Sequence, residues 1–304
     1  MKKDFISIND LTAKEIKDIF SLTEKLKKNK AKFSTVLAGK TLALIFQKPS
    51  CRTRVSFEVG MYQLGGYSIY LGPEELKLGV REAIKDVAQT LSRYVDGMVL
   101  RTFEHENILE LARYAAVPVI NGLSDFSHPC QALADVYTIR EKFKNLKNLT
   151  LAYVGDGNNV CHSLLYCCSK MGLNMNVATP KGYEPSSLVI KEAKAIAKSK
   201  NAKIVLFNNP KNAVKSADVI YTDVWASMGQ EKEAEKRKRI FQGFQVNKNL
   251  LKWAKTGALI MHCLPAHRGE EITDEVIDGK NSVVFDQAEN RLHVQKAILC
   301  SLLK

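Results

Sequence analysis

Short apolar runs alternate with segments of helical periodicity along the chain. The run 40–46 has strand character, and a proline and a serine end it. From 52 to 64 apolar residues recur at helical spacing, the following glycine pair is typical of a helix end, and 67–71 predicts a second strand. A strand, a turn, a helix and a strand in this order are typical of a parallel α/β unit.

The same alternation continues to the carboxyl end. The predicted strands are 98–101, 117–121, 149–154, 173–178, 204–207, 219–222, 258–261 and 283–285. The predicted helices are 104–115, 129–143, a helix that ends at Met171 before Gly172, and 288–303. We therefore predict an α/β fold with two doubly wound parallel-sheet domains, linked by helices and separated by a cleft, with ligands at the carboxyl ends of the strands.

The predicted domain boundary lies near the lysine- and asparagine-rich end of the helix around 132–146. One domain spans 1–146, and the other spans 147–287. The apolar-patterned helix 288–304 is expected to pack back on the first domain. A length of 304 residues fits two domains of roughly 150 residues each.

Composition narrows the class of protein. Hydrophobic residues make up 45% and charged residues 25%, which is typical of a globular protein and excludes a disordered tail, a fibre or a disulfide miniprotein. No run approaches the roughly 18 apolar residues of a membrane span, and polar residues near Asp10 argue against a signal peptide. The 7 cysteines contain no Cys-x-x-Cys pair, which favours reduced thiols in a cytoplasmic protein.

The chain is basic, because 45 Lys and Arg against 32 Asp and Glu leave a net charge of +13. Such a surface attracts nucleic acid, acidic membranes or phosphorylated metabolites, or is a solvated lysine-rich surface. The densest basic block, 236–239, follows acidic residues and predicts an exposed mixed-charge helix rather than a nucleic-acid-binding stripe.

Polar residues follow several predicted strands. Ser50, Arg52 and Thr53 open a helix, which favours either an anion site at its N-terminus or an ordinary cap. Arg101 ends a strand, where it faces a ligand or forms an ion pair. His128 and Gln131 open another helix and could point at one ligand, although a histidine there can equally be structural.

The turn Gly155-Asp156-Gly157 invites a dinucleotide-binding interpretation. Val160 occupies the place of the third glycine, and no acid stands about 20 residues further on, so we expect a small polar ligand instead. Asp223 follows another strand and could hold an ammonium group. Cys263 is either a thiol polarised by a ligand or a small buried hydrophobe.

No metal or cofactor is expected. His262, Cys263 and His267 resemble metal ligands only weakly, because no second matched pair exists.

The positions of the polar residues taken together are more informative than any one of them. Five polar residues each follow a different predicted strand, where a doubly wound fold presents its chemistry: Arg101, His128, Asn159, Asp223 and Cys263.

Four stretches carry a family resemblance: 50–58 (SCRTRVSFE), 128–131 (HPCQ), 223–230 (DVWASMGQ) and 262–265 (HCLP). Together they resemble the aspartate/ornithine carbamoyltransferase family, over nearly the whole chain, and the last two stretches resemble its ornithine branch. The resemblance implies that carbamoyl phosphate and L-ornithine give L-citrulline and phosphate in arginine metabolism. It also implies a homotrimer with active sites near subunit interfaces, without nucleic acid or membrane partners.

The resemblance assigns residues to each substrate. The carbamoyl phosphate positions are Ser50, Cys51, Arg52, Thr53, Lys77, Arg101, His128, Gln131, Cys263, Leu264 and Arg291. The ornithine positions are Asn159, Asp223, Ser227 and Met228. Arg101, His128 and Cys263 are the expected catalytic residues. Domain 1–146 is thereby the carbamoyl phosphate domain and 147–287 the ornithine domain.

Two positions depart from the family pattern. Cys51 stands where the family usually has Thr, a mild change if that residue contributes mainly its backbone N–H. Lys77 stands where bacterial members typically carry Gln, and the resemblance places this residue toward a neighbouring subunit's phosphate, where a lysine adds positive charge.

Three other functions remain open at this point. A transcarbamoylase for putrescine or an acylated ornithine shares the phosphate half, although Asp223 favours a free α-ammonium group. A non-catalytic anion-binding protein accounts for the charge but not for the convergence of polar residues. A nicotinamide oxidoreductase lacks its third glycine and its acid.

Overall fold

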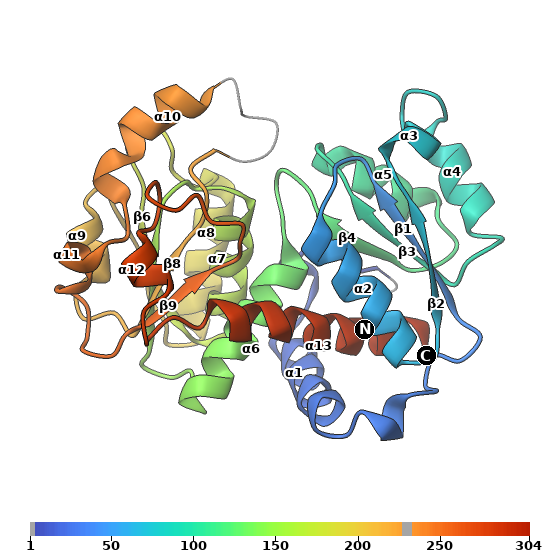
Figure 1. The fold of residues 1–304 in the computed structure, drawn as a ribbon, viewed down its shortest axis with the longest axis horizontal. Helices are drawn as coiled ribbons and strands as arrows, with labels where there is room; N and C mark the ends of the chain where they lie inside the picture. Colours follow the sequence, from blue (N-terminus) through green and yellow to red (C-terminus); the bar gives the residue numbers. More distant parts are fainter. Residues whose placement is uncertain (1–3, 227–232) are drawn as a thin grey trace. The chain divides into compact units, whose positions relative to one another are not determined.

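The computed structural model describes residues 4–226 and 233–304. The chain divides into two compact units, and each contains a parallel sheet flanked by helices (Figure 1). The first unit consists of residues 1–134 and 289–304, and the second consists of residues 135–288. The division falls within the helices α6 (Pro129–Phe143) and α13 (Val284–Leu303), so the polypeptide passes between the units inside two helices.

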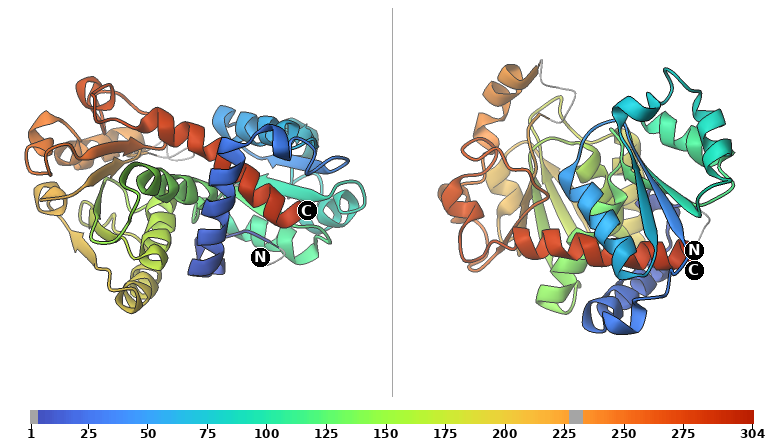
Figure 2. Two further views of the ribbon diagram at one scale, coloured as in Figure 1. Left: turned by 90° about the horizontal axis from the view of Figure 1, so that it is seen from below. Right: turned by 45° about the vertical axis from the view of Figure 1, so that its right-hand side comes forward.

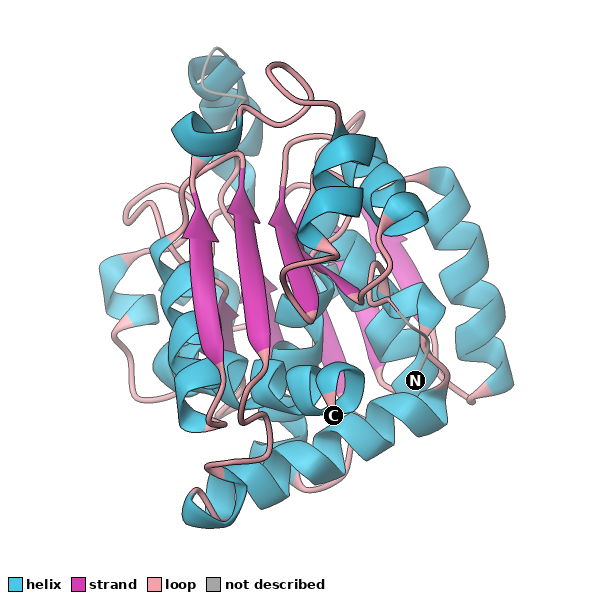
Figure 3. Ribbon diagram, turned by 90° about the vertical axis from the view of Figure 1, so that its right-hand side faces the viewer, coloured by secondary structure: helices cyan, strands magenta, loops and turns pink. Residues whose placement is uncertain are grey.

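Among the described residues of the first unit, a sheet of four parallel strands has the order β2-β1-β3-β4. Figure 3 shows neighbouring strands that run in the same direction. Its strands are β1 (Thr41–Phe46), β2 (Tyr67–Leu71), β3 (Gly97–Arg101) and β4 (Val119–Leu123). Its helices are η1 (Ile8–Asp10), α1 (Ala13–Lys28), η2 (Ala31–Phe33), α2 (Cys51–Gln63), α3 (Pro73–Leu76), α4 (Ile84–Leu91) and α5 (His105–Tyr114).

Two helix layers cover this sheet. Apolar residues of α4 and α5 pack against Ala43 and Leu100 on one face of the sheet. A Cβ atom at Gly97 would lie 2.7 Å from Cδ2 of Leu303, so the side chain of this α13 residue packs directly on β3. The Lys27 ammonium of α1 donates to Asn290 of α13 at 2.9 Å, where the two helices cross (Figure 2).

The part of the second unit that the structure describes has a sheet of five parallel strands in the order β7-β6-β5-β8-β9. Its strands are β5 (Thr150–Val154), β6 (Asn174–Ala178), β7 (Ile204–Phe207), β8 (Val219–Thr222) and β9 (Leu259–His262). Its helices are α7 (Asn159–Met171), α8 (Ser187–Ser199), α9 (Pro210–Val214), α10 (Ala234–Phe241), η4 (Gln242–Phe244), α11 (Lys248–Leu251) and α12 (Asp274–Ile277).

The predicted fold class, with two parallel-sheet α/β domains, is confirmed. The predicted strand 283–285 is wrong, because α13 begins at Val284 and residue 282 makes only an isolated bridge to β9. A run of three apolar residues is too short to distinguish a strand from the first turn of a buried helix. Among the described residues, no helix is both long and apolar enough to cross a membrane.

The basic block 236–239 lies on α10 as predicted, but it is not exposed throughout. Arg237 is 7% exposed and its guanidinium contacts Asp156 at 2.9 Å, whereas the other three basic side chains are exposed. Charge patterning shows that a helix is amphipathic or polar, but it does not show which cation is buried with a partner.

Candidate active site

The strand order of each sheet reverses at one point. In the first unit the reversal lies between β1 and β3, and in the second it lies between β5 and β8. At such a point the connections leave the sheet in opposite directions, and the loops leave a crevice at the carboxyl ends of the strands. Polar residues that the sequence predicts to be near ligands lie at both reversal points.

The loop after β1 and the end of β3 meet in the first unit. Phe46 pairs with Arg101 across the two strands, and the Gln47 N–H donates to the Arg101 carbonyl at 2.8 Å. Arg101 is 7% exposed. Its position as the last residue of a fully buried strand keeps the guanidinium at the carboxyl edge of the sheet.

The helix α2 begins at this edge. Ser50 is its N-cap, and the Thr53 N–H donates to Ser50 Oγ at 3.3 Å. The N–H groups of the first turn, which include that of the exposed Cys51, have no partner further back in the helix and form the positive end of its dipole. This arrangement suits an anion.

Arg291 connects three elements of the first unit. Its guanidinium donates to Gln131 Oε1 at 2.9 Å and to Thr53 Oγ1 at 2.8 Å. The Ser50 hydroxyl donates to the same Thr53 oxygen at 3.1 Å. Residues far apart in the sequence are thereby joined in one polar network, on α2, α6 and α13.

His128 lies in a strongly cationic environment. Burial, followed by the charges of Arg291, Arg101, Lys48 and Arg52, holds the pKa of its imidazole well below the ordinary value. The imidazole is therefore neutral near pH 7 and can donate one N–H without carrying charge. Four cations around one neutral donor form a site for an anion with a polarisable oxygen.

Lys48 was not among the residues predicted from the sequence. Its side chain is buried, its ammonium lies 4.6 Å from the centre of the Phe103 ring, and it contributes to the low pKa of His128. A lysine two residues after a buried strand and two before a helix cap was visible in the sequence, but spacing alone did not distinguish it from a solvated lysine.

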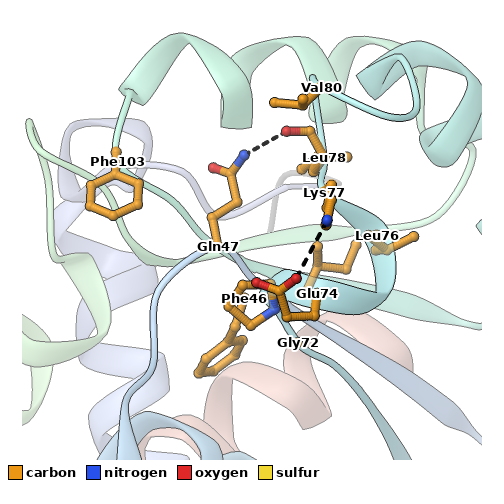
Figure 4. A pocket seen from close by; sticks show the side chains of 11 residues that line it. Phe46, Gln47, Gly72, Glu74, Leu76, Lys77, Leu78, Val80 and Phe103 are labelled. Atoms are coloured by element: carbon orange, nitrogen blue, oxygen red, sulfur yellow. Dashed lines mark hydrogen bonds and ion pairs between the residues drawn. The ribbon is translucent and has the colours of Figure 1, made fainter.

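Lys77 lies in the loop after α3, in a left-handed backbone conformation with φ 44°. Its ammonium lies 3.5 Å from Glu74, and both residues line a cavity of about 280 Å³ together with Gln47 and Phe103 (Figure 4). The lysine is half-exposed, so its charge is available to solvent on this side of the first unit.

The second unit places amide and carboxylate groups at its reversal point. Asn158 caps α7, where its Oδ1 accepts from the Val160 and Cys161 N–H groups. Its Nδ2 donates to Asp223 Oδ2 at 2.8 Å. Asn158 thus orients the carboxylate. This role was not predicted from the sequence, although an asparagine before a helix start is a recognisable cap.

Cys263 follows β9 and faces the same carboxylate. Its thiol donates to Asp223 Oδ1 at 3.0 Å. Burial, reinforced by Asp223, raises the pKa of the Cys263 thiol well above its ordinary value. The thiol therefore remains protonated near pH 7 and acts as a hydrogen-bond donor. Leu264, which follows it, also belongs to the second unit and has φ 58°.

The other predicted ornithine residues are only partly described. Asn159 is buried in the first turn of α7, where its Oδ1 accepts from the Val160 N–H at 2.9 Å. Ser227 and Met228 lie outside the described residues. Asn159, Asp223 and Cys263 all lie at the carboxyl ends of strands of the second sheet or in the turns that follow them.

Close packing within the protein explains the second glycine of the turn after β5. A Cβ atom at Gly157 would lie 2.3 Å from the Pro185 nitrogen and 2.4 Å from the Glu184 carbonyl carbon. The second glycine is therefore required by close approach of the chain's own backbone, and a dinucleotide is not needed to explain it.

Asp156 and Arg237 form a buried ion pair beside the same turn. Burial raises the pKa of Asp156 to about 6, although the nearby Arg237 charge acts in the opposite direction. Arg237 also donates to the Trp225 carbonyl at 2.9 Å, and its guanidinium lies over the Tyr183 ring at 5.0 Å. The cation is thus fully engaged by groups of the second unit.

Comparison with known proteins identifies the family. Residues 3–141 match the carbamoyl-P binding domain of aspartate/ornithine carbamoyltransferase, and residues 147–302 match its Asp/Orn binding domain. An ornithine carbamoyltransferase from Thermococcus kodakarensis is 58% identical over 303 residues, which cover 99% of this chain and 96% of the relative.

Solved structures agree with the sequence comparison. The ornithine carbamoyltransferase of Pyrococcus furiosus superposes with a TM-score of 0.96 at 56% identity, covering 99% of this chain and 97% of that one. The anabolic enzyme of Campylobacter jejuni superposes with a TM-score of 0.94 at 38% identity, covering 99% and 98%. With both domain models matched along the chain, this protein belongs to the aspartate/ornithine carbamoyltransferase family.

Proposed function

We propose that this chain is an ornithine carbamoyltransferase, which transfers the carbamoyl group of carbamoyl phosphate to the δ-amine of L-ornithine. The products are L-citrulline and phosphate. The observation that carries the proposal is the group of four cations around the neutral His128. Such a group suits a dianionic donor with a carbonyl oxygen, and the relatives with this name are up to 58% identical.

In this proposal the first unit holds carbamoyl phosphate, as expected for the predicted domain 1–146 with the helix 288–304. Ser50, the backbone N–H groups from Cys51 onward and Arg52 bind the phosphate. Arg101, His128 and Thr53 direct donors at the carbamoyl oxygen, where negative charge develops in the tetrahedral state. Gln131 accepts from the carbamoyl NH₂, and Arg291 holds both Gln131 and Thr53.

The second unit holds ornithine, which corresponds to the domain predicted at 147–287. Asp223 pairs with the α-ammonium, and Asn159 donates to the α-carboxylate. The resemblance assigns Ser227 and Met228 to the same substrate. Asp223 is 6% exposed, so its ion pair with a substrate ammonium is only weakly screened by water.

Cys263 orients the reactive amine in this proposal. Its protonated thiol donates to Asp223 and is not a proton acceptor near pH 7. The amine must therefore lose its proton before it reacts. The neutral nitrogen attacks the carbamoyl carbon, the bond from that carbon to the phosphate oxygen breaks, and the excess proton leaves with phosphate or to water. Leu264 completes this part of the site.

We also propose that the enzyme assembles as a homotrimer and works in the cytoplasm. β2 is an edge strand, and its Tyr67 and Ile69 are 68% and 39% exposed, respectively. Exposed apolar residues on an edge strand favour coverage by another chain. Light scattering should give a mass of about three times the 34.0 kDa of one chain, and a monomer would contradict the assembly.

An assay of carbamoylated product tests the activity. The purified protein is incubated with carbamoyl phosphate and, separately, L-ornithine, putrescine, N-acetylornithine or L-aspartate. We expect citrulline from ornithine, with kcat/KM at least about a hundredfold above the other amines, because only ornithine combines a δ-amine with a free α-ammonium for Asp223. A preference for putrescine or acetylornithine would assign a different acceptor, and no product from any amine would contradict the proposal.

A further inference from the structure

The segment after β9 is held by a side chain that the proposed reaction does not use. His262, the last residue of β9, is completely buried. Cys263 follows it, and Leu264 then adopts φ 58°, in the left-handed region that a residue with a Cβ atom disfavours. Something must therefore stabilise this backbone conformation.

Both ring nitrogens of His262 are engaged. The Leu264 N–H donates to His262 Nδ1 at 2.9 Å, so that nitrogen must be unprotonated. The ring proton then lies on Nε2, which is 3.0 Å from Glu271 Oε1 and donates to it. The imidazole thus links the strained residue on one side of Cys263 to a buried carboxylate.

Glu271 is itself held in place. Its Oε1 also accepts from the His267 N–H at 2.6 Å, and its side chain is completely buried. The backbone N–H of His262 donates to Gln287 Oε1 at 3.0 Å. Partners at 267, 271 and 287 therefore fix the imidazole and the start of the segment at the same time.

The geometry limits what this residue can do. Asp223, His262 and Cys263 offer ligand atoms within 4.8 Å of one another, which resembles a metal site. Both nitrogens of His262 already make hydrogen bonds within the protein, however, so a metal would have to displace one of them. The structure favours a positioning role over a ligand role.

We propose that His262 and Glu271 are positioning residues that hold the Cys263–Leu264 segment so that Cys263 stays on Asp223. The inference rests on the proposed function, because it assigns their effect to the orientation of ornithine. Without the acceptor at Nδ1, Leu264 loses the bond that stabilises its conformation, and the thiol moves away from the carboxylate. A displacement of about 1 Å near a reacting group can lower a rate by about a hundredfold.

Two substitutions separate the roles of the two ring nitrogens. His262→Asn places an oxygen near the former Nδ1 and can still accept from Leu264, but it no longer reaches Glu271. His262→Gln places an amide near the former Nε2 and can still donate to Glu271, but it leaves Leu264 without its acceptor. His267→Gln is the matched control, because the His267 side chain is 51% exposed.

We expect His262→Gln to lower kcat/KM for ornithine at least about tenfold, while the dissociation constant for inorganic phosphate, measured by calorimetry, stays within about twofold. His262→Asn should lie between this variant and wild type, and His267→Gln should equal wild type. Folded His262→Gln enzyme with wild-type kcat/KM would overturn the proposal.

Alkylation of Cys263 gives a readout that does not depend on turnover. Iodoacetamide reacts with the thiolate, which is scarce while the thiol is buried on Asp223. In His262→Gln the alkylation rate of the peptide containing Cys263 should rise severalfold, whereas that of the exposed Cys51 should not change. An unchanged rate at Cys263 would argue that the imidazole does not hold the segment.

The wild-type protein provides a test that needs no variant at 262. Histidine labelled with ¹⁵N should show that the neutral imidazole of His262 is the tautomer with its proton on Nε2. A proton on Nδ1 would overturn the proposal even if the His262 variants do not fold. If wild type forms no citrulline, the proposed function fails, while the tautomer and the alkylation rates still decide whether His262 holds Cys263.

Discussion

The two units have the same kind of sheet but opposite chemistry at the points where their strand order reverses. The first unit surrounds His128 with Lys48, Arg52, Arg101 and Arg291. The second unit presents Asp223 with amide and thiol donors, and its buried cation, Arg237, is paired with Asp156. The topology fixes where ligands bind, whereas the residues after each strand decide which charge they carry.

The largest expected effect concerns the substrate of the second unit. Between pH 6 and about 8, kcat/KM for ornithine should rise about tenfold per pH unit, because the free δ-amine has a pKa of about 10 and only the neutral form reacts. The rise should level off at higher pH, where the α-ammonium group that pairs with Asp223 loses its proton. His128 should add no inflection, because its pKa is held well below its ordinary value.

This pH profile is measured at several solvent viscosities, since an effect of viscosity would show that diffusion rather than chemistry limits the rate. With chemistry limiting, a flat profile would mean that the amine is bound charged and deprotonated in the enzyme. That result would contradict the proposal that the amine loses its proton without a proton acceptor in the second unit.

The next effect concerns the cations of the first unit. Arg101→Ala should lower kcat at least about a hundredfold, because one donor to the developing oxyanion is lost. Arg113→Ala, which removes an exposed arginine of α5, is the control and should be within about twofold of wild type. Near-normal turnover of the Arg101 variant would remove this residue from the site.

The third effect concerns the buried ion pair of the second unit. Burial raises the pKa of Asp156 from 3.8 to about 6. Between these values the folded protein keeps a proton that the unfolded chain has lost, so the free energy of unfolding falls as pH rises. Wild type should lose on the order of 3 kcal/mol relative to Asp156→Asn between pH 4 and 7.

Urea unfolding of both proteins measures this difference, followed by tryptophan fluorescence. Trp225 and Trp253 both lie in the second unit, so the signal reports on the unit that contains the ion pair. If the free energy of unfolding changes equally with pH in wild type and Asp156→Asn, then Asp156 ionises normally. The charge of Arg237 would then fully compensate the burial of this carboxylate.

The fourth effect should separate the two substrates. Asp223→Asn should raise KM for ornithine by about tenfold to a hundredfold, because an ion-paired hydrogen bond contributes about 1.5–3 kcal/mol. Binding of carbamoyl phosphate, measured by calorimetry without ornithine, should not change, and Asp86→Asn on the exposed face of α4 is the control. An equal loss for both substrates would contradict the assignment of Asp223 to ornithine.

The smallest effect concerns Lys77. If its charge acts on a bound phosphate, Lys77→Gln should raise KM for carbamoyl phosphate a few-fold and make it less dependent on salt. Lys85→Gln, at another exposed lysine of the first unit, controls for a general loss of charge. Salt curves identical to wild type would mean that Lys77 serves only its own ion pair with Glu74.

The parts of this molecule that sequence could predict are those with strong periodicity or a strong stop. The bounds of β8, Val219–Thr222, agree with the prediction, and α7 ends at Met171 as predicted, before Gly172 with φ 73°. β4 begins at Val119, two residues later than predicted. The apolar run that predicted the strand includes Pro118, which has no N–H to donate to a neighbouring strand.

The sequence does not show which distant residues contact one another in the folded protein. Arg101 and Asp223 stood out because each is a charge at the end of a buried strand. Lys48, Asn158 and Arg237 did not, because their importance arises from partners distant in sequence or from burial that composition does not specify. The link between His262 and Glu271 depends in the same way on two loops meeting in space.

The order in which the chain is made has a consequence for the first unit. Residues 289–304 complete that unit, and Arg291 joins Thr53 to Gln131 within it. During synthesis the strands of this unit precede Arg291, so its polar network can form only after the second unit has been made and Arg291 has left the exit tunnel. A chain cut before residue 291 would lack the guanidinium that joins Thr53 to Gln131, although both of these residues would still be present.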